Sequence, residues 1–247
     1  MQQPPAPSSP ESLGKSPAPC FLFPVKPTTT LATHTTDDGS KFVLQHHDGH
    51  HYLRIDGVQL MSTTASSSEQ QMAEIACERL PHRPRILIGG LGFGFTLRRT
   101  LELSPPDAHV IVAELLPEII RWNRELLAEV NGTLLEDPRV HIHEGDVFDL
   151  ISRTSGPDRF HTIMLDVDNS PDPLVQRGNA RLYDRRGLDL VKSALHPRGR
   201  VVYWSANQDK SFARSLQRAF PKCHSVPAKA YPKARRFTHT LFVANRG

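Results

Sequence analysis

Four glycines lie within six positions after a short apolar run, in the sequence ILIGGLGFGF at residues 86–95. A loop with so few side chains lets the backbone approach a ligand closely, as in the loops that follow the first strand of nucleotide-binding sheets. The dinucleotide fingerprint G-x-G-x-x-G is not met, because Phe95 stands where its third glycine would be. A P-loop is excluded too, since no Lys-Ser or Lys-Thr pair follows. The spacing favours a nucleoside without pyrophosphate, and the alternative is a turn that serves packing only. The candidate loop glycines are Gly89, Gly90, Gly92 and Gly94.

Two carboxylates follow the next two apolar runs at corresponding points. Glu114 ends HVIVAEL, about 20 residues after the loop, where an acidic side chain can accept both ribose hydroxyls. Asp146 follows VHIHEG, where it can accept a hydrogen bond from an adenine amino group. Each has a plainer alternative: a surface glutamate before a helix that begins at Pro117, and an N-cap for the helix VFDLISRT. Together with the glycine loop, they predict a pocket of the S-adenosylmethionine type.

The elements that must position these residues alternate between strand and helix. Because parallel strands are covered on both faces, apolar strands separated by helices predict a doubly wound α/β fold with a mostly parallel seven-stranded sheet. The final strand, RFTHTLFVAN, has no helix after it and is expected to enter antiparallel. The other expected strands are RILIGG, HVIVAEL, VHIHEGD, FHTIMLDVD and RVVYWSA. The expected helices are FTLRRTLEL, PEIIRWNRELLAEV, VFDLISRT, LYDRRGLDLVKSAL and DKSFARSLQRAF.

Composition divides the chain into three parts. Residues 1–32 are rich in Pro, Ser and Thr and are expected to form a disordered tail. Residues 33–64 contain short strand-like runs separated by DDG, HDG and IDG turns, which predict a small antiparallel β-unit. Residues 65–247 form the nucleoside-binding domain. Its first helix lies in SSSEQQMAEIACERL, where Ser66 and Glu69 have the spacing of a capping box.

Charge and cysteine content limit the possible partners. The chain has 247 residues, a formal charge of +4 and three widely separated cysteines, so we expect a cytoplasmic protein without a disulfide framework or a zinc site. No signal peptide or membrane helix is expected. The histidines of KFVLQHHDGHHY lack further ligands at suitable spacing, so we expect a solvated hairpin and no metal. The stretch KAYPKARRF is interpreted as a solvated hairpin, not as a nucleic-acid site.

From YLRIDGVQLMS to its end, the chain resembles the spermidine synthase-like branch of the class I methyltransferase fold. IDGVQLMS and SEQQMAE resemble that family's LDGVVQ and DEFIYHEM, and IGGLGFGFTLR resembles GGGDGGTLR. VAELLPEII, EGDVFDLI and IMLDVDNSPDP resemble the ribose-binding strand, the adenine-contacting segment and the catalytic strand end. LYDRRGLDLVKSALHPRGRVV resembles the family's LFSREFYELLKRALKPGGVLV. The order and spacing of these segments make the likeness specific for this fold.

The resemblance implies transfer of an aminopropyl group from decarboxylated S-adenosylmethionine to an amine. It assigns the catalytic base to Asp166 and cofactor contacts to Glu114, Asp146, Val147 and Pro173. It implies Asp168, Asn169 and Glu74 as substrate contacts. The resemblance also suggests a homodimer.

The acceptor side departs from the family pattern. The aspartate of GGGDGG has no counterpart, because Gly92 or Phe93 stands there, and the tyrosine and histidine of YHEM fall on Met72 and Ala73. The second aspartate of DSSD falls on Asn169, with Asp168 one place early. A dicationic polyamine needs several carboxylates. The sequence therefore supports the cofactor better than the acceptor.

Three functions remain open on these residues. The first is aminopropyl transfer to a small-molecule amine in polyamine biosynthesis. The second is methyl transfer from S-adenosylmethionine to a small molecule or macromolecule, which the loss of the loop aspartate would suit, because that carboxylate would repel the carboxylate of the intact cofactor. The third is nucleoside binding without catalysis. The match of Asp166 and Pro173 to the catalytic strand end places the first reading ahead.

Overall fold

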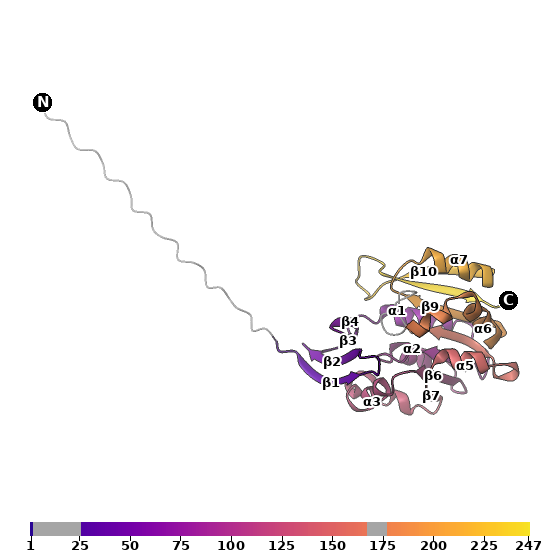
Figure 1. Cartoon of the computed structure of the whole chain (residues 1–247), viewed down its shortest axis with the longest axis horizontal. Coiled ribbons are helices and arrows are strands. Elements are labelled where there is room, and N and C mark those ends of the chain that lie inside the picture. The colour runs from indigo at the N-terminus through magenta and orange to yellow at the C-terminus, as the bar shows by residue number, and fades with distance from the viewer. Residues whose placement is uncertain (2–25, 167–176) are drawn as a thin grey trace.

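The computed structural model describes residue 1 and residues 26–166 and 177–247 (Figure 1). The described chain forms a four-stranded antiparallel sheet and a seven-stranded mixed sheet with helices on both faces. Asp168, Asn169 and Pro173, which the resemblance places at the acceptor and cofactor sites, lie outside the described residues. No helix of the described residues is both long and apolar enough to cross a membrane.

The small sheet has the order β1-β2-β3-β4, with neighbouring strands antiparallel. Its strands are β1 (Thr29–Thr35), β2 (Lys41–His47), β3 (His50–Ile55) and β4 (Val58–Ser62). Phe42, Leu44, Leu53 and Ile55 alternate along β2 and β3 and are buried on the inner face. This confirms the antiparallel β-unit. The expected start at residue 33 is wrong, because β1 begins at Thr29 and pairs with β2 through its backbone although its side chains are mostly exposed.

The histidine-rich hairpin differs from the solvated one that the sequence predicts. The β2–β3 register places His46 opposite His51, and their ring centroids lie 5.0 Å apart. His51 is buried because it shares the inward face of β3 with Leu53 and Ile55. Burial lowers the pKa of His51, and the nearby His46 lowers it further. The described residues contain no group of three or more His, Cys, Asp or Glu placed to hold a metal ion.

The large sheet has the order β10-β11-β9-β8-β5-β6-β7. The strands β5 (Arg85–Gly89), β6 (His109–Glu114), β7 (Val140–Glu144), β8 (Phe160–Leu165) and β9 (Leu195–Ser205) are parallel. The last two strands, β10 (Lys222–Ala228) and β11 (His239–Asn245), run antiparallel to their neighbours. The antiparallel entry of the final strand is confirmed. Because β5 lies between β6 and β8, the strand order reverses there, at the point where doubly wound sheets bind ligands.

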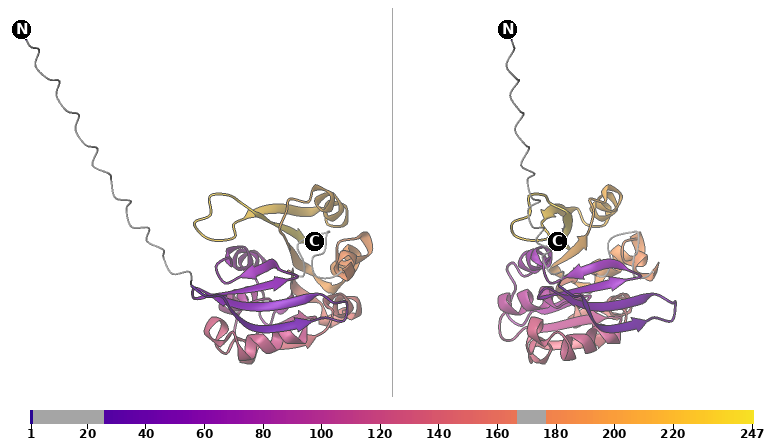
Figure 2. Two further views of the ribbon diagram at one scale, coloured as in Figure 1. Left: turned by 60° about the vertical axis from the view of Figure 1, so that its left-hand side comes forward. Right: turned by 90° about the vertical axis from the view of Figure 1, so that its left-hand side faces the viewer.

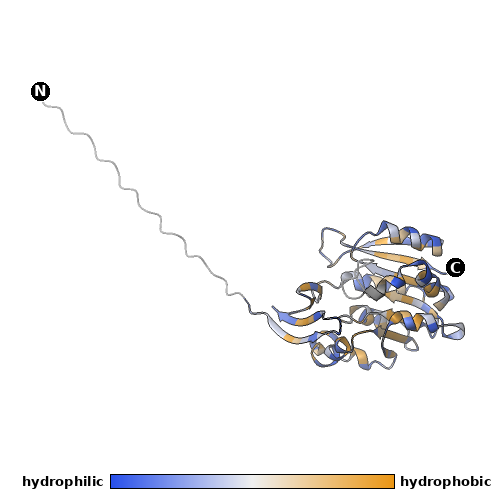
Figure 3. Cartoon of the chain, in the orientation of Figure 1, coloured by the Kyte–Doolittle hydropathy of each residue, from blue (hydrophilic) through white to orange (hydrophobic). Residues whose placement is uncertain are grey.

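Apolar residues of the parallel strands point alternately to the two faces of the sheet (Figure 3). Each face contributes to its own buried apolar core. Ile86 and Ile88 contribute to the face covered by α1, α2 and α3, whereas Leu87 contributes to the face covered by α5, α6 and α7. The first face also receives the inner residues of the small sheet, so the two sheets share one apolar core (Figure 2). The helices are α1 (Ser67–Ala76), α2 (Phe95–Leu103), α3 (Pro117–Glu125), α4 (Ala128–Asn131), α5 (Val147–Arg153), α6 (Arg185–Ala194) and α7 (Lys210–Ala219). Three 3-10 helices are described: η1 (Leu134–Glu136), η2 (Gly156–Asp158) and η3 (Arg177–Leu182).

Several elements differ from the sequence-based expectation. The helix predicted over residues 117–130 is divided into α3 and α4, and β10 was not predicted as a strand. The capping box is not formed: Ser66 is the N-cap of α1, but its side chain caps no backbone N–H. Instead, Glu69 Oε2 accepts from Ser68 Oγ at 2.6 Å, so this carboxylate does not reach back to the N-cap.

Candidate active site

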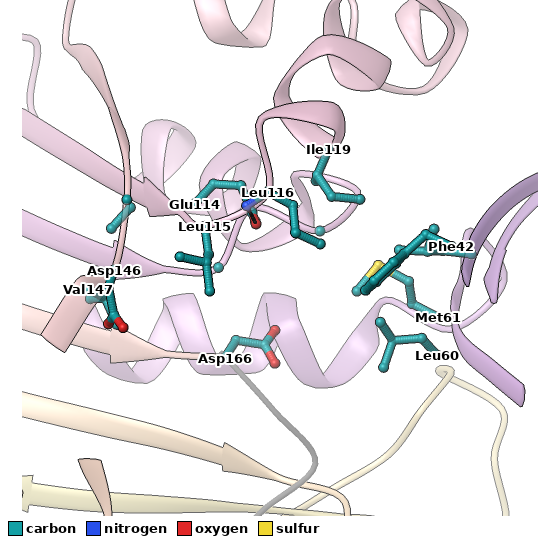
Figure 4. A pocket seen from close by; sticks show the side chains of 15 residues that line it. Phe42, Leu60, Met61, Glu114, Leu115, Leu116, Ile119, Asp146, Val147 and Asp166 are labelled. Carbon is teal, nitrogen blue, oxygen red and sulfur yellow. Dashed lines mark hydrogen bonds between the residues drawn. The ribbon is translucent and has the colours of Figure 1, made fainter. Parts of the chain in front are cut away.

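A cleft lies between the carboxyl ends of the parallel strands and the small sheet (Figure 4). It encloses roughly 690 Å³ of atom-free space, a figure that includes the solvent at its open mouth. The lining combines the glycine loop and three carboxylates with an apolar wall. The residues that line it are Phe42, Leu53, Leu60, Met61, Gly90, Gly92, Ala113, Glu114, Leu115, Leu116, Ile119, Gly145, Asp146, Val147 and Asp166.

The glycine loop contributes backbone to this cleft at two of the four expected positions. Gly90 and Gly92 line it, with φ of +92° and +52°, values that side-chain-bearing residues rarely adopt. Gly89 is the buried last residue of β5, and Gly94 is the left-handed N-cap of α2. Asn123 of α3 holds the loop from behind, since its Nδ2 donates to the Gly92 carbonyl at 2.9 Å. The loop is therefore both exposed to the cleft and fixed in position.

Replacing Gly92 with alanine is expected to weaken nucleoside binding about tenfold, because a β-carbon there would lie 3.0 Å from Met61 Cε and push that side chain into the cleft. Gly156→Ala is the matched control. Gly156 has a similar φ of +55°, but a β-carbon there meets nothing within 4 Å. Both variants should lose stability from the left-handed backbone, and only Gly92→Ala should lose affinity in a calorimetric titration. Equal nucleoside affinities of the two variants would show that a side chain at position 92 does not disturb the cleft.

Glu114 ends β6 with its carboxylate directed between the glycine loop and α3. The residue is 8% exposed, and its two oxygens accept from the backbone N–H groups of Leu91 and Leu116, each at 2.9 Å. Burial raises the pKa of Glu114, and these backbone hydrogen bonds oppose the rise. The backbone N–H groups of Leu115 and Gly92 also lower its pKa, so a ligand hydroxyl would share the carboxylate with these four N–H groups. This arrangement fits the expected contact with a ribose.

Asp146 is the N-cap of α5, one of the two roles that the sequence left open, and the adenine contact stays a prediction. One oxygen accepts from Phe148 N at 2.7 Å and so caps α5, while the other forms an ion pair with Arg181 from η3. The Arg181 guanidinium lies 4.2 Å from the centre of the Phe148 ring. Asp146 and Val147 line the cleft, as expected for adenine contacts, but the carboxylate already has a cationic partner that the sequence did not indicate.

Asp166 follows β8 at the opposite side of the cleft from Glu114 (Figure 4). Its backbone N–H donates to the Gly89 carbonyl at 3.0 Å, which fixes the residue beside the end of β5. Its carboxylate has no hydrogen bond or ion pair with any side chain of the described residues. Burial, and secondarily the charge of Glu69, raises the pKa of Asp166 to about 8. A carboxylate with this pKa can accept a proton near neutral pH.

Glu74 is not brought into the cleft with these residues. Its Oε1 accepts from Arg99 Nε at 3.1 Å and from Arg99 Nη2 at 2.9 Å, and the ion pair lies on the surface between α1 and α2. The sequence reasoning missed Glu69, which interacts with Asp166, and the apolar wall from Phe42, Leu60 and Met61. No local sequence pattern indicated that this apolar wall would line the cleft. Glu69 was noticed only as a capping-box residue.

The lining fits an adenosine with a positively charged sulfur. Leu115, Leu116 and Ile119 with the small sheet supply apolar surface for the nucleoside, and Glu114 lines the cleft at one side. Asp166 lies at the other side, where its carboxyl group, once ionised, would face the sulfonium end. No cationic side chain lines the cleft among the described residues.

Comparisons with known proteins agree with this geometry. The chain is 34% identical over 152 residues to polyamine aminopropyltransferase 1 of Hyperthermus butylicus, a match that covers 61% of this chain and half of that relative. Spermidine synthase from Thermotoga maritima has a TM-score of 0.71 at 19% identity, with 88% of this chain and 73% of that chain covered. The fold is that of spermidine synthases. No family model matches the chain.

A second spermidine synthase structure, in complex with the transition state analogue AdoDATO, has a TM-score of 0.70 at 17% identity, with 88% of this chain and 72% of that chain covered. The spermidine synthase-like resemblance and the doubly wound fold expected from the motifs are thus confirmed. The chain spans half the length of its Hyperthermus relative.

Proposed function

We propose that this protein transfers an aminopropyl group from decarboxylated S-adenosylmethionine to a small-molecule amine, a reaction of polyamine biosynthesis. The observation that carries the proposal is Asp166, a carboxylate without a cationic partner among the described residues, at the edge of a cleft that fits a nucleoside. The similarity to aminopropyltransferases supports it.

The chain's own groups have defined tasks in this reaction. Glu114 and the backbone of Gly90 and Gly92 bind and orient the nucleoside, and the wall around Phe42 and Met61 excludes water. Decarboxylated S-adenosylmethionine supplies, when bound, a carbon activated by the sulfonium, so that a neutral thioether leaves as the carbon–nitrogen bond forms. Asp166 accepts the proton that the acceptor's ammonium group must lose before its nitrogen can attack.

Methyl transfer from intact S-adenosylmethionine is the second candidate, since neither Gly92 nor Phe93 offers the loop carboxylate that would repel this cofactor. The neighbouring carboxylates of Asp166 and Glu69 weigh against it, because they would repel an added carboxylate near the sulfonium. Nucleoside binding without catalysis leaves unexplained an Asp166 that has no cationic partner among residues 26–166 and 177–247. A homodimer and a cytoplasmic location stay predictions from the sequence.

Calorimetric titration with the two cofactor forms side by side tests the choice. Decarboxylated S-adenosylmethionine should bind at least tenfold more tightly than the intact form, as expected if one like-charge contact is worth about 1.4 kcal/mol. Tighter binding of the intact form would replace aminopropyl transfer by methyl transfer. Binding of both forms without turnover of any amine would leave a nucleoside-binding protein.

A further inference from the structure

The direction of α1 across the large sheet is fixed by contacts at both of its ends. Ser67 N donates to the Ala230 carbonyl at 3.1 Å, in the connection between β10 and β11. That connection lies at the carboxyl edge of the parallel strands, since β11 runs antiparallel to β9. At the other end of α1, Arg200 near the middle of β9 donates to the Ile75 carbonyl and, at 3.1 Å, to Glu78 Oε2. The first turn of α1, with Glu69, therefore lies at the edge of the sheet where Asp166 ends β8.

Asp166 faces the same side of the sheet as α1. Met164 is buried in the core shared with Met72 of α1, whereas Leu165 is buried in the core on the other face. Side chains alternate along a strand, so Asp166 continues on the side of Met164. On α1, Glu69 precedes Met72 by three residues and lies one turn nearer to the carboxyl edge. The two carboxylates are thus placed as neighbours, and they interact electrostatically.

This pair has no counter-charge among the described residues. The side-chain partner of Glu69 is the neutral hydroxyl of Ser68. On α2, Arg99 is engaged by Glu74 and Glu102. On β9, Arg200 is engaged by Glu78 at the far end of α1.

On β11, burial lowers the pKa of His239, which keeps this side chain neutral at neutral pH. Two neighbouring, half-buried carboxylates repel one another unless they share a proton or hold a cation. No cationic side chain of the described residues pairs with these two carboxylates. A cation between them would therefore have to come from a ligand.

We propose that Glu69 and Asp166 together bind the ammonium group of the acceptor, with Glu69 as the residue that positions this group against Asp166. The proposal rests on the proposed aminopropyl transfer and assigns its acceptor site. Glu69 supplies negative charge on the acceptor side, where the glycine loop carries none, since Gly92 and Phe93 are neutral.

The pair also determines how the reaction responds to pH. Burial raises the pKa of Glu69, and burial together with the charge of Glu69 raises the pKa of Asp166 to about 8. At neutral pH Asp166 of the free protein is therefore mostly protonated, and this proton must leave before a cation binds. Because protonated Asp166 can neither attract an ammonium nor accept its proton, kcat/KM for the acceptor should fall as the pH drops below about 8.

Glu69→Gln is expected to raise the KM for putrescine roughly 10- to 100-fold, because one charged contact to the ammonium is lost. It should also move the acidic limb of the kcat/KM profile to lower pH, since Asp166 no longer faces a like charge. Glu78→Gln is the matched control: Glu78 follows the same helix, but it is exposed and contacts Arg200 away from the cleft. Thermal unfolding shows whether each variant is folded.

Calorimetric titration of putrescine, which needs no turnover, separates this inference from the proposed function. Binding that weakens in Glu69→Gln and not in Glu78→Gln supports the ammonium site even if no aminopropyl group is transferred. If wild-type protein transfers the group but Glu69→Gln matches Glu78→Gln in affinity and pH profile, Glu69 has no such role. Absence of putrescine binding to the wild-type protein would also overturn the site.

Discussion

Asp166→Asn should reduce aminopropyl transfer roughly 10²- to 10⁴-fold, the range for loss of a positioned general base. The asparagine has the same shape and keeps the backbone hydrogen bond to the Gly89 carbonyl, but its amide cannot accept the acceptor's proton. Turnover is measured by the release of the thioether nucleoside at pH 8.5, above the pKa of about 8, where the wild-type carboxylate is mostly ionised.

Affinity for the cofactor should stay within a few-fold in this variant. Asp158→Asn is the control, because Asp158 lies shortly before β8 at the opposite end of the strand and its side chain is 70% exposed. It should keep full turnover. If Asp166→Asn retained the wild-type rate, Asp166 would not be the base, whatever the state of the rest of the cleft.

Glu114→Gln should weaken binding of decarboxylated S-adenosylmethionine roughly 100-fold. Two hydrogen bonds from ribose hydroxyls to a buried charged acceptor are replaced, and an amide can offer one oxygen where the carboxylate offers two. The amide nitrogen would also face one of the backbone N–H groups of Leu91 and Leu116, so the glycine loop should shift.

Stability should change less than affinity in this variant. Burial raises the pKa of Glu114, which means that ionisation of the native carboxylate opposes folding above the ordinary pKa, and the neutral amide removes that cost. Glu144→Gln is the control. Glu144 lies opposite Glu114 in the backbone register of β6 and β7, but its side chain is exposed and does not line the cleft. Equal cofactor affinities for the two variants would remove Glu114 from the nucleoside site.

The sequence was sufficient to predict the parts of the cleft that follow strands. Gly90, Gly92, Glu114, Asp146 and Asp166 each come directly after or at the end of an apolar run, and the carboxyl ends of parallel strands meet at one edge. Apolar periodicity locates such strands, so the residues after them can be placed without a structure.

The missed parts depend on contacts between distant segments. The Arg181 partner of Asp146 comes from η3, and the wall around Met61 comes from a separate sheet. No local sequence pattern predicts either contact. β10 was missed because its side chains are mostly exposed and include Pro227, so it lacks the apolar run that marks the central strands.

Glu69 shows how a local rule can hide a tertiary role. Ser66 and Glu69 have capping-box spacing, but the glutamate accepts from Ser68 instead of capping, and its charge raises the pKa of Asp166. Glu74, which matches a family motif, is held on the surface by Arg99. The match to a family motif therefore did not place Glu74 in the cleft.

The chain passes without a long excursion from β4 into α1, so a single span carries both Met61, against the glycine loop, and Glu69, beside Asp166. Only a few bonded residues therefore separate the contact between Met61 and the glycine loop from Glu69. In the proposed reaction the nucleoside and the amine would contact the two ends of this one span, so each would influence the binding of the other without touching it.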